Sequence, residues 1–194
     1  MTITEVAELV WRHSHTASFG KTENWSDKLF TKSWGELLHP QLNWRGYGAG
    51  WYWFLVNMNL EELHAVQRPI SLPMKGCDIG ALVQANVETF GTRLLCATQK
   101  NGRVVIYNGH EGSICDRVRA HFSLNNHRTG ALGLKHFLLH SRSWEVRFFA
   151  APCLPSLPKA EQDRVQLLMN SKSGRCAVES AWRSVYGWPV LCKE

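Results

Sequence analysis

A short run in the middle of the chain constrains the fold most. Arg103 to Tyr107 is rich in β-branched and aromatic side chains, which favour a strand, and Asn101-Gly102 before it is typical of a two-residue hairpin turn. The glycine of Tyr107-Asn108-Gly109 then predicts a tight turn. Ser113 is a good N-cap, so a helix should follow over about 114–122. The run therefore predicts a strand, a glycine turn and a helix in direct succession.

The predicted helix has one apolar face and one cationic face. Arg117 and His121 lie one turn apart and share a face. Ile114, Val118 and Phe122 recur at the same spacing and predict the buried stripe. Two interpretations remain open at this point: a hairpin packed on an amphipathic helix whose cations face solvent, or a cationic binding site.

Two further segments carry polar side chains in strongly patterned surroundings. Gly50 to Asn57 is an aromatic strand pattern that contains Tyr52 and follows turn residues. A late helical stripe over about 175–186 contains Glu179, and Gly187 ends it. Taken alone, Glu179 is a charge in the first turn of a helix, where the helix dipole stabilises it.

Together these segments resemble the GIY-YIG nuclease superfamily, and most of all its stand-alone restriction endonucleases. In that family a Gly-x-Tyr strand and a Tyr-x-Gly strand precede a helix with an Arg and, one turn later, a His. A late helix supplies one metal-binding Glu and is followed by a proline. The positions that carry the resemblance are Tyr52, Tyr107, Gly109, Arg117, His121, Glu179 and Pro189.

The resemblance implies an endonuclease that hydrolyses phosphodiester bonds of double-stranded DNA with Mg²⁺, or Mn²⁺ in its place. Tyr52 or Tyr107 would take a proton from the attacking water, and the choice between them stays open. Arg117 would hold the scissile phosphate and His121 would orient groups or relay a proton. Glu179 would bind the metal, for which a single carboxylate is chemically sufficient because water and phosphate oxygens complete the shell.

The resemblance also implies an α+β fold, with a small antiparallel or mixed sheet flanked by helices. One domain would cover residues 1–194, with an N-terminal extension over 1–48 and an insertion over 58–98 between the motif strands. A competing alignment uses Gly91 to Cys96 as the first motif strand, but it has no tyrosine at the third position. We favour Tyr52.

Elsewhere the chain alternates helical and extended patterns. Three prolines between 152 and 158 predict a loop, since proline interrupts both helices and strands. The other expected elements are a first helix capped by Thr4, helices over about 78–90, 132–140 and 160–170, and a strand over about 144–149.

The charge balance is compatible with a polyanionic partner. The chain has 22 Lys and Arg against 16 Asp and Glu, a formal charge of +6, which favours DNA but is also found in many ordinary basic proteins. The basic residues nearest the motif helix are the candidate DNA contacts: Arg119, His127, Arg128 and Lys135. Most of the nine tryptophans should pack in the core, and an exposed minority could stack on a base or wedge into a distorted duplex.

Several features bear on location and biological role. Six widely spaced cysteines predict buried free thiols in a reducing compartment, and no apolar run is long enough for a membrane span, so we expect a cytoplasmic protein. Restriction enzymes of this type often dimerise, which suggests a homodimer. Modification-dependent, homing and phage nucleases would share the same residues. Family members often carry an Asn after the late proline, and its absence from 190–194 keeps a non-cleaving DNA-binding module as an alternative.

Overall fold

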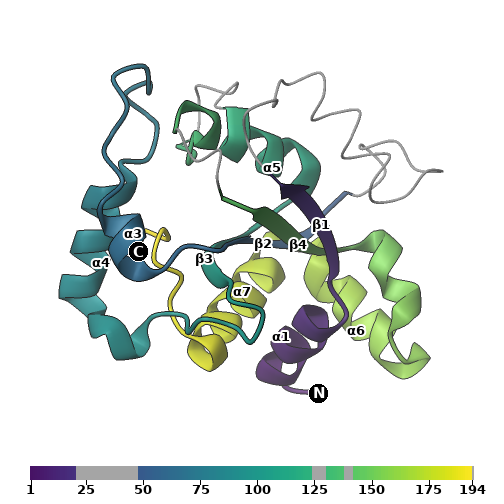
Figure 1. The fold of residues 1–194 in the computed structure, drawn as a ribbon. Helices are drawn as coiled ribbons and strands as arrows, with labels where there is room; N and C mark the ends of the chain where they lie inside the picture. The colour runs from purple at the N-terminus through teal and green to yellow at the C-terminus, as the bar shows by residue number, and fades with distance from the viewer. Residues whose placement is uncertain (21–47, 124–129, 138–141, 194) are drawn as a thin grey trace.

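The fold is an α+β arrangement in which helices cover both faces of a four-stranded sheet (Figure 1). The computed structural model describes residues 1–20, 48–123, 130–137 and 142–193. The strands lie in the order β1 (His15–Gly20), β4 (Trp144–Ala150), β2 (Gly50–Val56) and β3 (Val104–Glu111), and all neighbours are antiparallel. The helices are α1 (Ile3–Arg12), α3 (Leu60–His64), α4 (Ile79–Leu94), α5 (Ile114–Ser123), α6 (Lys159–Asn170) and α7 (Lys172–Tyr186), with 3₁₀ helices η3 (Leu134–His136) and η4 (Ala151–Ser156). The predicted α+β class with a small antiparallel sheet is confirmed.

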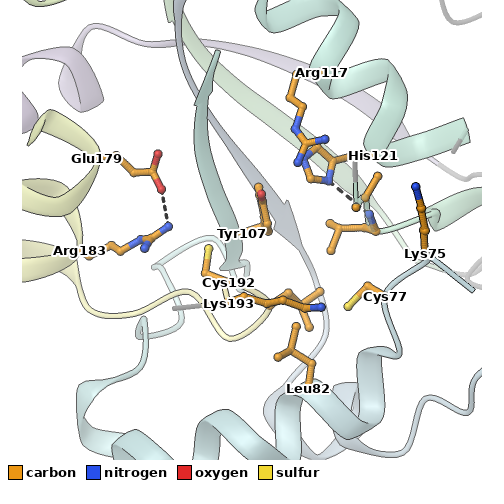
Figure 2. Close-up of a pocket in the computed structure, with 14 residues that line it drawn as sticks. Lys75, Cys77, Leu82, Tyr107, Arg117, His121, Glu179, Arg183, Cys192 and Lys193 are labelled. Atoms are coloured by element: carbon orange, nitrogen blue, oxygen red, sulfur yellow. Dashed lines mark hydrogen bonds and ion pairs between the residues drawn. The ribbon is translucent and has the colours of Figure 1, made fainter. Parts of the chain in front are cut away.

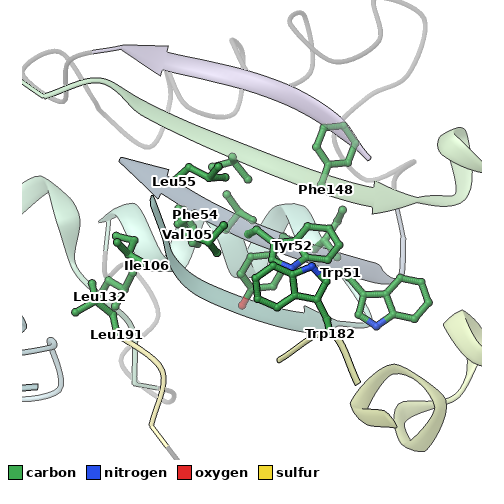
Figure 3. Packing of buried hydrophobic residues seen from close by; sticks show 14 of the residues in the cluster. Trp51, Tyr52, Phe54, Leu55, Val105, Ile106, Leu132, Phe148, Trp182 and Leu191 are labelled. Carbon is green, nitrogen blue, oxygen red and sulfur yellow. The ribbon is translucent and has the colours of Figure 1, made fainter. Parts of the chain in front are cut away.

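The central strand β2 is buried along its whole length because both of its faces are covered (Figure 3). Side chains alternate between the faces of a strand. Trp53 packs on Trp11 of α1, with ring centroids 5.1 Å apart, whereas Phe54 packs on Phe122 of α5, also at 5.1 Å. Tyr52 shares the α5 face with Phe54, so the alternation directs this tyrosine toward Arg117 and His121.

Several predicted elements are confirmed with small shifts. Strands β2 and β4, and helices α5, α6 and α7, occupy the expected ranges. The turn at Asn101-Gly102 is present, with Gly102 at a φ of +76°. It does not join two strands of the sheet, because β3 pairs with β2 and the residues before the turn form no strand.

One prediction near the motif was wrong. Tyr107-Asn108-Gly109 is not a turn: β3 continues to Glu111, because its pairing with β2 holds Gly109 opposite Tyr52. Gly91 to Cys96, the first motif strand of the competing alignment, form no strand, because helix α4 runs to Leu94 with a kink at Gly91.

Three predictions outside the motif need correction as well. The cap of α1 is Thr2, not Thr4, because Thr2 and Glu5 form a reciprocal capping box. The proline-rich segment over 152–158 is mostly the 3₁₀ helix η4, with Pro152 in the first turn, where the missing N–H has no partner to lose, and Pro155 inside the helix. Only the 3₁₀ turn η3 stands within the expected helix over 132–140, and residues 138–140 lie outside the described ones.

The N-terminal extension and the insertion both join the core. The extension supplies α1 and the edge strand β1. The insertion supplies α3 and α4, and buried Asn86 of α4 donates its side-chain amide to the carbonyls of Val190 (2.8 Å) and Cys192 (2.9 Å). Leu191 donates its N–H to Ile106 of β3 at 2.7 Å, so the C-terminal segment covers the outer edge of that strand.

All six cysteines are free thiols, as predicted, although Cys176 is exposed and Cys96 is half-buried. Among the described helices, none has the length and apolar character needed to cross a bilayer. The division into extension, insertion and single domain stays a prediction.

Candidate functional site

A cavity of about 370 Å³ lies beyond β3, the edge strand of the sheet (Figure 2). Because β3 is the last strand, helices on opposite faces of the sheet can both reach past it. Helix α5 contributes Arg117 and His121, β3 contributes Tyr107, and α7 contributes Glu179 and Arg183. The opposite wall comes from the insertion, from the residues between α5 and η3, and from the C-terminal segment: Lys75, Cys77, Leu82, Gly130, Ala131, Leu132, Leu191, Cys192 and Lys193.

The structure therefore brings four of the five predicted catalytic residues to one cavity. Tyr52 is the exception, since it does not line the cavity and packs against Tyr107, with the two rings stacked at a centroid distance of 6.1 Å. Among the motif residues, the tyrosine that faces the cavity is Tyr107.

His121 is held in one neutral state by its two hydrogen bonds. Its Nδ1 accepts the backbone N–H of Leu132 at 3.3 Å, so the ring proton sits on Nε2, which donates to the hydroxyl of Tyr52 at 3.0 Å. Burial, and secondly the charge of Arg117, lower the pKa of His121 well below its ordinary value. His121 is therefore uncharged near neutral pH, and its Nε2–H is a fixed hydrogen-bond donor that positions the hydroxyl of Tyr52.

Arg117 joins the two tyrosines on the side of the cavity. Its guanidinium hydrogen-bonds the hydroxyls of both Tyr52 and Tyr107. Burial raises the pKa of Tyr107, and it raises the pKa of fully buried Tyr52 further above its ordinary range. Arg117 opposes both shifts because it stabilises a phenolate, and it stays charged at any working pH.

Gly109 is required by a close contact and not by a turn. A Cβ at this position would lie 2.5 Å from the hydroxyl oxygen of Tyr52 and 3.2 Å from a ring carbon of Tyr107. The backbone of Gly109 has no positive φ. A side chain on Gly109 would therefore displace the two tyrosines.

Glu179 lies in the middle of α7, not in the first turn of a helix. Its carboxylate forms an ion pair with Arg183, one turn later on the same helix, and its Oε2 lies 3.8 Å from Nε2 of His110. Burial raises the pKa of Glu179, while Arg183 opposes the shift. The negative charge of Glu179 is therefore stabilised by the ion pair with Arg183 and not by the helix dipole.

Arg183 is a site residue that the sequence interpretation missed. Its Nε donates to Oδ1 of Asn108 at 2.9 Å, and its guanidinium carbon lies 4.5 Å from the centre of the Trp188 ring. The signal was present, because Arg183 is four residues after Glu179 on a predicted helix. The segment after Pro189 reaches the cavity with Cys192 and Lys193, which contribute a thiol and an amine.

The predicted DNA contacts are only partly placed. Half-buried Arg119 and exposed Lys135 are not among the residues that line the cavity, and His127 and Arg128 lie outside the described residues. Over the described ranges, no group of three or more His, Cys, Asp or Glu side chains is placed to hold a metal. A cation at this cavity would have Glu179 as its protein carboxylate.

Comparison with known proteins does not place the chain in a family. No protein-family model, no curated protein and no solved structure matches it. The cavity beyond β3 and the chemistry of its side chains are therefore the basis for a functional proposal.

Proposed function

We propose that the protein is a Mg²⁺-dependent DNA endonuclease of the GIY-YIG type and that the cavity beyond β3 is its active site. The observation that carries the proposal is the convergence of a phenol, a guanidinium, an imidazole and a carboxylate from three elements. The pairing of the strands supports it, because Tyr52 of the Gly-x-Tyr strand lies directly opposite Gly109 of the Tyr-x-Gly strand.

In this proposal Tyr107 is the proton acceptor. Its phenol faces the cavity, whereas Tyr52 is enclosed by the core. As water attacks phosphorus, its proton moves to the Tyr107 oxygen while the phenol gives its own proton to a phosphate oxygen; the new P–O bond forms, the bond to the leaving oxygen breaks, and the leaving oxygen takes up that proton. Arg117 neutralises charge on the phosphate and on the phenol oxygen, and the pair formed by Tyr52 and His121 holds Arg117 and Tyr107 in position.

The donor set fits a hard cation bound by one carboxylate. Glu179 offers oxygen ligands at the cavity, and Mg²⁺ commonly takes few protein ligands beside water and phosphate oxygens. Such an ion would stabilise charge on the leaving oxygen. Arg183 now neutralises Glu179, and it lines the same cavity across from Arg117. A phosphate and Glu179 would therefore compete for the Arg183 guanidinium.

The biological role that suits these features is restriction of double-stranded DNA in host or phage defence, by a cytoplasmic enzyme that cuts both strands as a homodimer. The second candidate is a DNA-binding module that does not cleave. Two observations favour it: the ion pair that occupies Glu179, and the absence of an asparagine after Pro189.

A cleavage assay separates the two candidates. Plasmid DNA, unmodified phage DNA and hydroxymethylated or glucosylated phage DNA are incubated with Mg²⁺ and the wild-type protein, Arg117→Ala or Glu179→Ala. Arg164→Ala on α6, an exposed cation that does not line the cavity, is the matched control. We expect cutting by the wild type and the control alone. Robust cutting by Arg117→Ala or Glu179→Ala would refute the site, and binding without cutting by the wild type would favour the silent module.

A further inference from the structure

The loop between α3 and α4 displays two aliphatic side chains to solvent. Figure 1 shows this segment extending away from the helices on either side of it. Ile70 and Met74 are 106% and 98% exposed, whereas the next most exposed large hydrophobic residue of the described ranges, Leu167, is at 63%. Water contact over two whole aliphatic side chains is unfavourable, so their display calls for a partner that covers them.

The loop is a built structure. Leu72 donates its N–H to Pro69 at 3.0 Å and Gly76 donates to Pro73 at 2.8 Å, which makes two successive turns. The Arg68 guanidinium donates to the carbonyls of Leu72 (3.4 Å), Pro73 (2.9 Å) and Gly76 (3.1 Å). Leu72 itself is buried, at 6% exposed. Hydrogen bonds within the loop and the buried side chain of Leu72 therefore fix the conformation in which Ile70 and Met74 are exposed.

The same loop is fastened to the wall of the cavity. Lys75, which follows Met74 directly, lines the cavity, and so does Cys77. Cys77 donates its N–H to the carbonyl of Ala131 at 3.1 Å, and Gly76 forms a β-bridge with the same residue. Met74 is therefore directly joined to a residue of the cavity wall, and the same segment carries the cations of Arg68 and Lys75.

We propose that the loop over residues 68–75 is a DNA wedge: Ile70 and Met74 insert between base pairs beside the phosphate that occupies the cavity. This inference rests on the proposed function. Ile and Met are side chains that enter unstacked base steps, and the neighbouring cations suit phosphates better than an apolar protein surface. The tryptophans within the described residues are buried or half-buried, and the most exposed large apolar side chains of these residues are Ile70 and Met74.

The wedge also explains how a phosphate reaches a recessed site. Tyr107, Arg117 and Glu179 lie inside a cavity, whereas the phosphates of a straight duplex follow a smooth outer surface. Unstacking one base step kinks the duplex, and a kink projects a phosphate toward the protein. The cost of unstacking is offset by the burial of Ile70 and Met74 between bases.

The test uses Ile70→Ser/Met74→Ser and, as matched control, Leu167→Ser on α6. Duplexes that carry 2-aminopurine at several adenine positions report unstacking by increased fluorescence, without Mg²⁺ and without cleavage. We expect the increase with wild type and control and its loss in the double variant. Cleavage of intact duplex by the double variant should fall at least about tenfold, while a duplex with a mismatch, which is already weakened, should be cut within about threefold of wild type.

Each outcome decides the matter. An unchanged fluorescence increase in the double variant, or equal losses on intact and mismatched duplexes, overturns the wedge. If the wild type increases the fluorescence through Ile70 and Met74 but cuts no DNA, the wedge stands and the nuclease proposal fails. All three substituted side chains are exposed, so loss of folding is not expected.

Discussion

The substitution Gly109→Ala tests how the two motif strands build the site. The new methyl would lie 2.5 Å from the hydroxyl oxygen of Tyr52, where ordinary contact begins near 3.4 Å, so the ring must retreat by about 1 Å. Tyr52 is 1% exposed and cannot retreat without weakening its 3.0 Å hydrogen bond to His121. Overpacking costs about 1–3 kcal/mol and a lost hydrogen bond about 1 kcal/mol. We therefore expect a loss of about 2–4 kcal/mol in the free energy of unfolding.

Urea unfolding of purified protein measures this loss. The matched control is Gly112→Ala, where the nearest atom to a new Cβ is 4.0 Å away, and it should stay within about 0.5 kcal/mol of wild type. Tyr52→Phe removes the oxygen that is struck first, so the double variant should lose less than the sum of the single losses. If Gly109→Ala is as stable as Gly112→Ala, the close contact does not exist and the account of this glycine is refuted.

Three further predictions concern the cavity. Tyr107→Phe should lower kcat for DNA cleavage by about 10²–10⁴, the range for loss of a general base, whereas Tyr52→Phe should lower it much less; comparable losses would remove the distinction between the two tyrosines. Arg183→Met should raise KM for DNA, because a cation that faces the phosphate is lost. It should also lower the Mg²⁺ concentration for half-maximal rate, because Arg183 competes with Mg²⁺ for the carboxylate of Glu179. A Mg²⁺ titration checks this, and an unchanged midpoint contradicts it. The pKa of His121 is lower in the folded than in the unfolded protein, so protonation of this side chain favours unfolding. The free energy of unfolding should therefore be highest above pH 6.5 and should decrease as the pH falls, by up to about 1.4 kcal/mol per pH unit. Urea midpoints measured between pH 7 and 5 should fall less steeply for His121→Gln than for the wild type.

Much of the motif could be predicted from the sequence because the signals are local. A run of consecutive aromatic residues predicted β2, and the spacing of Ile114, Val118 and Phe122 predicted α5 with Arg117 and His121 on one face. Each pattern depends on neighbours within one or two turns.

The errors arose where distant contacts decide the conformation. Gly109 has the composition of a turn, but pairing with β2 extends β3 through it, and the reason for glycine is the hydroxyl of Tyr52, which is 57 positions earlier in the chain. The tautomer of His121 depends on the backbone of Leu132. Arg183 was overlooked because its part in the cavity depends on Asn108, from a strand that the sequence does not place beside α7.

The central claim is that Glu179 serves Mg²⁺-dependent phosphodiester cleavage at the cavity beyond β3. Its most direct test is the rate at which supercoiled plasmid is converted to nicked or linear DNA by the wild type and by Glu179→Gln, which keeps the shape of the side chain and removes its charge. Glu88→Gln, at an exposed position of α4, is the matched control. The account predicts Mg²⁺-dependent conversion by wild type and control, and a rate at least about a hundredfold lower for Glu179→Gln. Equal rates for Glu179→Gln and the wild type would contradict it.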